Sequence, residues 1–259
     1  MQQLSVVIIC KNEADIIGQT LQSLAGLTDD IIVYDNGSTD DTIAEIIKSD
    51  VHLHRGAWEG FGKTKNKANA LAKYDWILSL DADEAISKEL KEELLQWEPG
   101  NEQTVYKFPF RNFIGNKLLR HGDWGTDRHI RLFNRQIVQW NEAGVHEELI
   151  LPGEVSVKEF RGYVLHRTWR NTEEYRSKMQ RYALLGAEKY FKQGKKATWF
   201  KRRFSAFFNF FNAYFLKLGF LDGKAGYQCA KMSAYYTSLK YERLKQLWNT
   251  EQGTKNKEL

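Results

Sequence analysis

Residues 4–42 read LSVVIICKNEADIIGQTLQSLAGLTDDIIVYDNGSTDDT. Residues 4–10 form a continuous apolar run rich in β-branched side chains, which is typical of a strand buried on both faces. Residues 14–24 follow with apolar side chains at helical spacing, and residues 31–34 form a second short apolar run. Strand, helix and strand in this order predict a parallel sheet with right-handed helical crossovers.

The alternation of strand-like and helix-like segments continues to about residue 100. We expect helices at 39–47 and 63–72, strands at 51–54 and 76–80, and a helix that Ser87 caps and that ends near Gln96. The pattern predicts an α/β fold with a mostly parallel, Rossmann-like sheet flanked by helices.

The segments beyond Pro99 follow a different pattern. Strand-like pieces at 105–111, 129–134 and 155–165 are separated by polar stretches, and they predict added, partly antiparallel strands and long loops that complete a site. From Thr172 the chain reads as helical and aromatic, and its polar end at 249–259 is expected to fray.

The overall composition narrows the choice of partners and compartment. A net charge of +5 favours polyanions, which include nucleic acid, an anionic membrane face and phosphorylated substrates. Cys10 and Cys229 lie far apart and imply no disulfide framework, which fits a reducing cytosol. The first apolar run is short for a signal peptide and lacks a basic flank, and no stretch has the roughly 20 apolar residues of a membrane span. We therefore expect a cytoplasmic protein.

Charged and polar side chains follow the predicted strands at their carboxyl ends, where open parallel sheets bind ligands. Lys11, Asn12 and Glu13 follow the first strand, residues 35–40 follow the second, and residues 81–84 follow the fourth. Lys63 and Lys65 open the third helix and are candidates to bind a diphosphate. Because buried strands that end in charges are costly without a ligand or an ion, the sequence predicts a binding site at this edge.

Asp81 and Asp83 are the sharpest local signal, because they place two carboxylates directly after the apolar run WILSL. Such hard oxygen ligands suit Mg²⁺ or Mn²⁺, which would stabilise a departing diphosphate. The alternative is an exposed acidic turn that caps a helix.

Asp35 lies where a base or ribose would bind, whereas residues 36–40 have turn and capping chemistry as an alternative. The G-x-G-x-x-G of dinucleotide binders is missing, which disfavours a dehydrogenase.

Three stretches, SVVIICKNEADII, IIVYDNGSTDDT and WILSLDADE, resemble in this order the nucleotide-sugar half of family 2 glycosyltransferases, which have the GT-A fold. The resemblance covers roughly residues 4–100. Three later stretches, GVHEEL, GYVLHRTWRNTEEYRSKMQRYA and GFLDGKAGY, are similar to the subgroup that contains lipopolysaccharide-core β-1,4-glucosyltransferases. The resemblance implies Asp35 at the nucleoside, Glu13 near the uridine, Asp81 and Asp83 at the diphosphate and metal, and inversion at the anomeric carbon.

Inversion by direct displacement needs a base beside the attacking hydroxyl. Glu147 is our choice, against the alternative of an exposed loop carboxylate, and Asp123 and Asp127 are its competitors. Glu84 is expected to hold the donor sugar. His166 follows an apolar run and is expected to be a third metal ligand, with a structural histidine as the alternative.

These expectations define a complete site. The predicted catalytic residues are Glu147 and Asp83, the predicted ligands of a divalent metal, Mg²⁺ or Mn²⁺, are Asp81, Asp83 and His166, and the predicted nucleotide-sugar contacts are Asn12, Glu13, Asp35, Lys65, Asp81 and Glu84. Residues 1–100 are expected to form the nucleotide-sugar-binding half of a GT-A domain, 101–170 its acceptor-side half, and 171–259 a helical, basic and aromatic extension.

The predicted reaction is transfer of a hexose, with glucose expected, from a UDP-sugar to a hydroxyl of a glycan or glycolipid acceptor, with lipopolysaccharide core expected. A polyprenyl-phosphate acceptor is the alternative within the same class. A basic nucleic-acid-binding protein is the alternative of another class, but it leaves the strand-end carboxylates unexplained, so no nucleic-acid partner is expected.

Residues 199–221 read WFKRRFSAFFNFFNAYFLKLGFL, with phenylalanines at helical spacing and a basic cluster at the start. An amphipathic segment of this kind suits peripheral binding to an anionic membrane surface, expected at the inner face of the cytoplasmic membrane. The alternative is a helix that packs its aromatic stripe on the catalytic domain. Asn209 and Asn212 interrupt the apolar run, which argues against a membrane span.

Overall fold

The computed structural model describes residues 2–142, 147–169 and 172–255. The chain forms two compact units. We call the first the sheet unit; it comprises Met1–Arg111 and Asp127–Arg167. The second, the helical unit, comprises Asn112–Thr126 and Thr168–Leu259. The segment Asn112–Thr126 belongs to the helical unit although it lies within the acceptor-side part of the sequence, and nothing in the sequence pattern indicated this.

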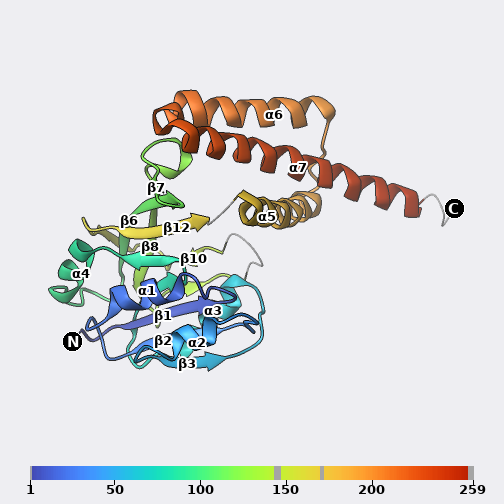
Figure 1. The fold of residues 1–259 in the computed structure, drawn as a ribbon. Coiled ribbons are helices and arrows are strands. Elements are labelled where there is room, and N and C mark those ends of the chain that lie inside the picture. Colours follow the sequence, from blue (N-terminus) through green and yellow to red (C-terminus); the bar gives the residue numbers. More distant parts are fainter. Residues whose placement is uncertain (1, 143–146, 170–171, 256–259) are drawn as a thin grey trace. The chain divides into compact units, whose positions relative to one another are not determined.

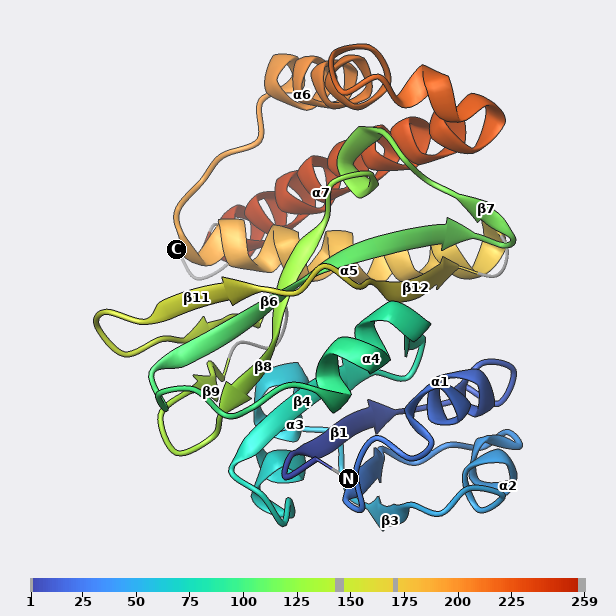
Figure 2. The same ribbon diagram turned by 90° about the vertical axis from the view of Figure 1, so that its left-hand side faces the viewer.

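The sheet unit is built on one mixed sheet, which Figure 2 shows with its strands side by side. The strand order is β3-β2-β1-β4-β8-β6-β12-β5. The first four of these strands are parallel, whereas β8 pairs antiparallel with both β4 and β6. The strands are β1 (Ser5–Cys10), β2 (Ile31–Asp35), β3 (His52–Arg55), β4 (Trp76–Asp81), β5 (Glu84–Ile86), β6 (Thr104–Ile114), β7 (Lys117–Leu118), β8 (Arg128–Asn134), β9 (Gln139–Trp140), β10 (Leu149–Ile150), β11 (Ser156–Glu159) and β12 (Val164–Trp169).

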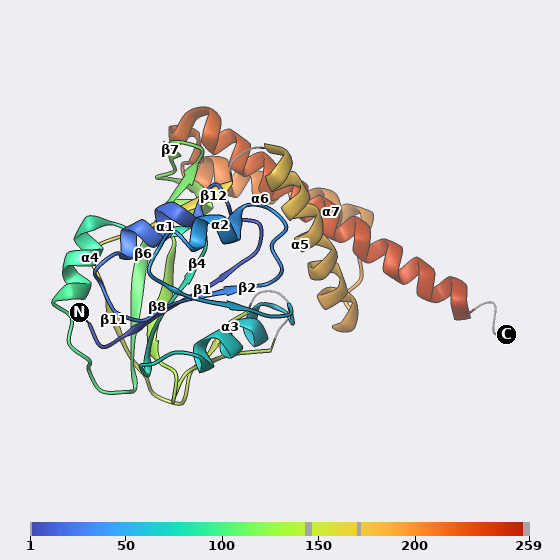
Figure 3. The same cartoon turned by 60° about the horizontal axis from the view of Figure 1, so that its bottom comes forward.

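Helices cover both faces of the parallel strands, which Figure 3 shows. Alternate residues of β1 point to opposite faces, so that Val6 and Ile8 pack in one cluster and Val7 and Ile9 in the other. The first face is covered by α1 (Ile17–Leu24), α2 (Thr42–Ile46) and α4 (Lys88–Leu95), and the second by α3 (Phe61–Ala70). The predicted cap of α4 is confirmed, because the Ser87 hydroxyl accepts the Leu90 N–H at 3.2 Å.

The predicted α/β sheet is confirmed, and the added strands differ from expectation in one place. The single strand expected at 155–165 is two strands, because β11 pairs parallel with β6 and β12 pairs antiparallel with β5. Gly162 lies between them, where a Cβ would stand 2.3 Å from the Leu90 backbone, so the chain passes α4 too closely for a side chain.

The helical unit contains three long helices, α5 (Thr172–Lys192), α6 (Trp199–Phe211) and α7 (Gly223–Lys255). The helix expected over 199–221 ends at Phe211, continues as a π-helical turn to Leu216, and is closed by Leu218, whose φ of 56° is left-handed. The expected frayed end was wrong for 249–255, because α7 runs to Lys255.

The helices of the described ranges include none that is both long and apolar enough to cross a membrane. Both cysteines are free thiols, and Cys10 is buried, as predicted. Burial raises the pKa of the Cys229 thiol to about 12, with Asp222 and Asp123 adding to it. A thiol with this pKa is neutral at physiological pH and is therefore a poor nucleophile.

Candidate active site

The acidic motif at the end of β4 is built around one buried arginine. Arg131, on the antiparallel neighbour β8, binds Glu84 through two contacts, Nη2 to Oε1 at 2.6 Å and Nε to Oε2 at 3.0 Å. Its Nη2 also lies 3.4 Å from Asp81 Oδ2, and the Asp81 backbone N–H donates to Glu84 at 3.1 Å. Glu84 is only 1% exposed and was expected to hold the donor sugar. Both of its oxygens contact Arg131, where they fix the turn that presents Asp81, and its contact with the donor sugar stays a prediction.

Lys65 connects this motif to the predicted base. Its Nζ lies 3.0 Å from Asp81 Oδ1 and 3.0 Å from Glu147 Oε1, and the side chain is 3% exposed. The ammonium also lies over the Trp140 ring, 4.6 Å from the centroid. Lys65 was expected to contact the nucleotide-sugar, and the structure shows it as the bridge between two carboxylates of the predicted site.

The position of Lys65 depends on how α3 packs against β9. The Asn66 side chain donates to the Trp140 carbonyl at 2.8 Å and accepts the Trp140 N–H at 3.0 Å. At Gly62 a Cβ would lie 1.7 Å from the Asn141 carbonyl oxygen, so only glycine permits this approach. The Asn141 N–H then bonds the Glu148 carbonyl at 2.9 Å, which holds the chain beside Glu147.

The charges of this cluster stabilise one another. Burial raises the pKa of the Asp81 carboxyl, but Lys65 and Arg131 outweigh that effect and hold it below its usual range. Burial lowers the pKa of Lys65, but Asp81 and the other carboxylates leave it raised. The lowered pKa of Asp81 stabilises the fold above the usual carboxyl pKa, and this contribution disappears as the pH falls through the folded-state value. Asp81 and Lys65 are therefore both charged at neutral pH.

Asp83 and His166 come together because β5 pairs with β12. His166 lies opposite Glu84 in the register of the two strands, and its Nε2 is 3.4 Å from Asp83 Oδ2. Within 2–142, 147–169 and 172–255, no three His, Cys, Asp or Glu side chains are grouped closely enough to hold a metal ion alone. Of the predicted ligands, Asp83 and His166 are together, whereas Asp81 faces Lys65 and Arg131.

The loops after β1 and β2 are tied to each other. Asn12, whose φ of 58° is left-handed, accepts the Thr39 N–H at 2.8 Å, and its own N–H donates to Ser38 Oγ at 2.9 Å. The Glu13 N–H donates to Thr42 Oγ1 at 2.7 Å. Both residues therefore lie at the carboxyl edge of the sheet, beside the loop that follows Asp35.

Asp35 itself is 1% exposed and holds a turn, since it accepts N–H groups from Gly37 at 3.0 Å and from Ser38 at 3.1 Å. The turn chemistry that the sequence offered for residues 36–40 is thus present. Next to it, Asn36 Oδ1 is a buried acceptor for which the described residues provide no donor. An acceptor of this kind is available to an N–H group of a ligand.

The two competing bases have other partners. Asp127 Oδ1 is 2.8 Å from His129 Nε2, and Asp123 belongs to the helical unit, where it pairs with Lys217. Lys63, at the start of α3, faces Glu142 at 3.3 Å with an exposed side chain. Residues 143–146 and 170–171, which belong to the stretches GVHEEL and GYVLHRTWRNTEEYRSKMQRYA, lie outside the described residues.

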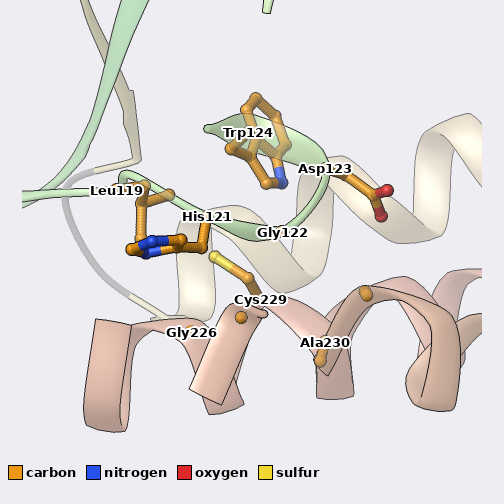
Figure 4. Close-up of a pocket in the computed structure, with 10 residues that line it drawn as sticks. Leu119, His121, Gly122, Asp123, Trp124, Gly226, Cys229 and Ala230 are labelled. Carbon is orange, nitrogen blue, oxygen red and sulfur yellow. The ribbon is translucent and has the colours of Figure 1, made fainter. Parts of the chain in front are cut away.

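A separate polar cluster lies inside the helical unit, and Figure 4 shows the small cavity beside it, with His121 among its lining residues. Asp222, with a side chain 5% exposed, accepts the N–H groups of Arg120 at 2.9 Å and His121 at 2.8 Å, and it lies 3.0 Å from His121 Nδ1. The adjoining cavity, lined by Trp124 and Cys229 among others, is about 10 Å³, near the minimum for one water molecule. The cluster is too small for a substrate and holds the loop in place.

Replacing Asp222 with alanine is expected to destabilise the protein by about 2–3 kcal/mol, because two partly buried N–H groups lose a buried, charged acceptor. Chemical unfolding of both proteins measures the difference. Asp123→Ala in the same loop is the matched control, since its partner Lys217 is exposed and the pair contributes little. Equal stability of the Asp222 variant and the wild-type protein would contradict this role.

Sequence reasoning gave too little weight to three residues of the site. Arg131, Asn66 and Trp140 were not among the predicted site residues. The alternation of His129, Arg131 and Phe133 along β8 puts these side chains on one face, which was the available signal for Arg131. No local pattern marks Asn66, because its partner is the backbone of a residue 74 positions away.

Comparison with known proteins identifies the family. A model described as glycosyl transferase family 2 matches residues 5–147. Over 95% of this chain and 90% of the other protein, the sequence is 28% identical to an uncharacterized glycosyltransferase of Rickettsia felis. It is 26% identical to the lipopolysaccharide core biosynthesis glycosyltransferase LpsC of Rhizobium meliloti, over 91% of this chain and 89% of LpsC.

Among solved structures, S. aureus TarS 1–349 in complex with UDP aligns with a TM-score of 0.47 at 14% identity, over 96% of this chain and 92% of that chain. The family match, together with the mixed sheet flanked by helices, confirms the predicted GT-A fold. The matched segment is more than half of the sequence, and the chain belongs to glycosyl transferase family 2.

Proposed function

We propose that the protein transfers a hexose from a UDP-sugar to a hydroxyl of a glycan acceptor, with inversion at the anomeric carbon. The observation that carries this proposal is the bridge through Lys65, which brings Asp81 of the acidic motif and Glu147 to one buried ammonium. Asp81 is then assigned to the diphosphate side of the site, and Glu147 is available as the base.

The nucleoside subsite is proposed at the loops after β1 and β2. Asn36 Oδ1 is the buried acceptor there, and the N–H of a uracil ring fits it as a donor. We assign Asn12, Glu13 and Asp35 to the walls of this subsite, because the hydrogen bonds between the loops fix their positions. The Asp35 carboxylate holds the turn and thereby positions the hydrogen-bond acceptor Asn36 Oδ1 beside it.

A divalent metal is part of the proposal for an electrostatic reason. Among the ion pairs of the described residues around the acidic motif, the carboxylates Asp81, Asp83, Glu84 and Glu147 are more numerous than the cations Lys65 and Arg131. A diphosphate would be repelled by this balance unless a cation joined it. Asp83 and His166 fit as two ligands, because Mg²⁺ and Mn²⁺ commonly take few protein ligands and complete their shell with phosphate oxygens. A bound metal supplies stabilisation of the charge on the leaving diphosphate.

In the proposed step, the acceptor hydroxyl oxygen forms a bond to the anomeric carbon while the bond from that carbon to the diphosphate oxygen breaks. Glu147 takes the hydroxyl proton, and UDP leaves with the electron pair. Lys65 holds the Glu147 carboxylate at 3.0 Å and so orients the base. Arg131 and Glu84 keep Asp81 in place, and all three act before the reaction by preorganising the site.

The acceptor class is proposed from the relatives. LpsC carries a name that states a role in lipopolysaccharide core biosynthesis, and the chain aligns with it over 91% of its length. We propose a lipid-linked glycan of this kind, with glucose as the donor sugar. A polyprenyl-phosphate acceptor is the other candidate, and the two differ in whether the attacking oxygen belongs to a sugar or to a phosphate.

The proposal is tested by incubating the purified protein with a panel of nucleotide-sugars and Mn²⁺ or Mg²⁺, with and without EDTA. We expect one UDP-sugar to raise the melting temperature only when metal is present, and to release UDP slowly in the absence of acceptor. Purified lipopolysaccharide core and polyprenyl phosphate are then compared as acceptors. Failure of every nucleotide-sugar to bind, together with binding of RNA or DNA, would refute the enzyme function.

A further inference from the structure

Helix α6 carries most of its large aromatic side chains on the face opposite to α7, although Phe210 packs against Tyr227 of α7. The small and polar side chains face α7: Asn209 Nδ2 donates to Thr237 Oγ1 at 2.6 Å, and Ala213 in the following turn is 4% exposed. Phe204 and Phe207 lie on the other face and are 56% and 66% exposed. A surface helix normally has the reverse arrangement, with its apolar stripe inside.

The exposed apolar side chains form one continuous surface, which we call the aromatic face. Its rings stack along the helix, with centroids 5.7 Å apart for Phe200 and Phe204 and 6.2 Å apart for Phe204 and Phe208. The surface continues through the turns after α6. Its members are Trp199, Phe200, Phe204, Phe207, Phe208, Phe211, Phe215, Leu216, Leu218, Phe220 and Leu221. Contiguous exposed apolar surface of this kind marks an interaction site.

The charged side chains of the segment that carries the aromatic face are cations, one of which, Lys217, pairs with Asp123. Between residues 189 and 221 the chain has eight Lys and Arg side chains and no Asp or Glu. Lys201 and Arg203 are exposed on α6 itself, and Lys195 and Lys196 precede it. Figure 1 shows this segment running into α6 at the end away from the turns that lead to α7. The surface is therefore apolar with a strongly cationic border.

Local folding explains the cations only in part. Arg203 lies over the Trp199 ring, and Lys195 and Lys196 lie over the rings of Tyr190 and Trp248. The amino end of a helix carries a partial positive charge and is stabilised by acidic side chains. The first turn of α6 has no acidic residue, and Lys201, Arg202 and Arg203 lie within its first five positions. These positions oppose the helix dipole, so an external anion is the simpler reason for them.

We propose that the aromatic face docks on the headgroup region of an anionic lipid bilayer. Phenylalanine and tryptophan rings enter the interface, and the cations of the border bind lipid phosphates. A second copy of the chain fits less well, because two borders rich in cations would repel each other. The inference rests on the proposed function in one respect, because docking would bring the enzyme to an acceptor substrate that is held in the bilayer.

The test is co-sedimentation of the full chain with vesicles of phosphatidylcholine that contain about 30% phosphatidylglycerol, which gives them an anionic surface. We expect binding to these vesicles, at least about tenfold weaker binding to pure phosphatidylcholine, and weakening by salt. Phe204→Ser/Phe207→Ser is expected to lower the partition coefficient at least about tenfold. The matched control is Ile47→Ser/Ile150→Ser in the sheet unit, whose side chains are 69% and 59% exposed.

A second readout reports the orientation. Trp199 is 68% exposed, so brominated lipids are expected to quench part of the tryptophan emission in the wild-type protein and less of it in Trp199→Phe. Equal binding of the Phe204→Ser/Phe207→Ser variant, or equal quenching with and without Trp199, would overturn the proposal. So would a concentration-dependent dimer that this variant abolishes, because a second copy would then occupy the face.

The test separates this inference from the proposed function. Donor binding with Mn²⁺ is measured without lipid, and we expect it to be equal in the Phe204→Ser/Phe207→Ser variant and the wild-type protein. Vesicle binding without any response to nucleotide-sugars would support the docking surface and refute the transferase. Donor binding without vesicle binding would support the transferase and refute the docking surface.

Discussion

Asp83→Ala is expected to abolish the metal-dependent response to the UDP-sugar and to lower the rate of sugar transfer at least about 100-fold. Asp83 is the carboxylate that lies beside His166, at 3.4 Å, and the pair is the only part of the predicted metal set that the described residues bring together. Without the metal ion that this pair is proposed to hold, the carboxylates of the acidic motif would repel the diphosphate. The measurement is the rise in melting temperature with UDP and Mn²⁺, followed by UDP release with acceptor.

The matched control for this variant is Asp75→Ala. Asp75 precedes the same strand, β4, at its opposite end, where it pairs with Arg135 at 3.0 Å and has a side chain 48% exposed. Its loss is expected to leave the metal response unchanged. If Asp83→Ala bound metal and turned over the donor like the wild-type protein, the proposed mechanism would be refuted.

The parallel half of the fold follows from short-range patterns, which is why the sequence predicted it. Residues 4–10 are apolar except for Ser5, and burial on both faces of β1 is the structural counterpart of that run. The carboxyl ends of β1, β2 and β4 then lie on one edge because the strands are parallel. The positions of Asp35 and Asp81 at this edge required no information beyond strand order.

The partners of the acidic motif depend on contacts between distant residues and were not predictable in the same way. Arg131 meets Asp81 across 50 positions, through antiparallel pairing of β8 with β4 that no local pattern specifies. Lys65 meets Glu147 across 82 positions. The end of α6 was missed for a different reason, since phenylalanines continue at helical spacing past Phe211, where the backbone widens into a π-helical turn.

Arg131→Met is expected to destabilise the protein by about 3–5 kcal/mol, which is the usual cost of leaving a buried carboxylate without its partner. Glu84 is 1% exposed and accepts two N–H groups of the guanidinium, so no water replaces them without a change in packing. The free energy of unfolding in urea measures the loss. Arg128→Met on the same strand is the control, because its partner Glu159 is exposed and the pair contributes little.

Combining Arg131→Met with Glu84→Leu separates the structural role of the pair from its role in the reaction. Removing both charges replaces a buried ion pair by apolar groups, and most of the lost stability is expected to return. Activity is expected to stay low, because Asp81 keeps Lys65 but loses the Arg131 contact and the Glu84 oxygen that accepts its N–H. A double variant as active as the wild-type protein would show that the pair only stabilises the fold. A stable but inactive one would show that it positions Asp81.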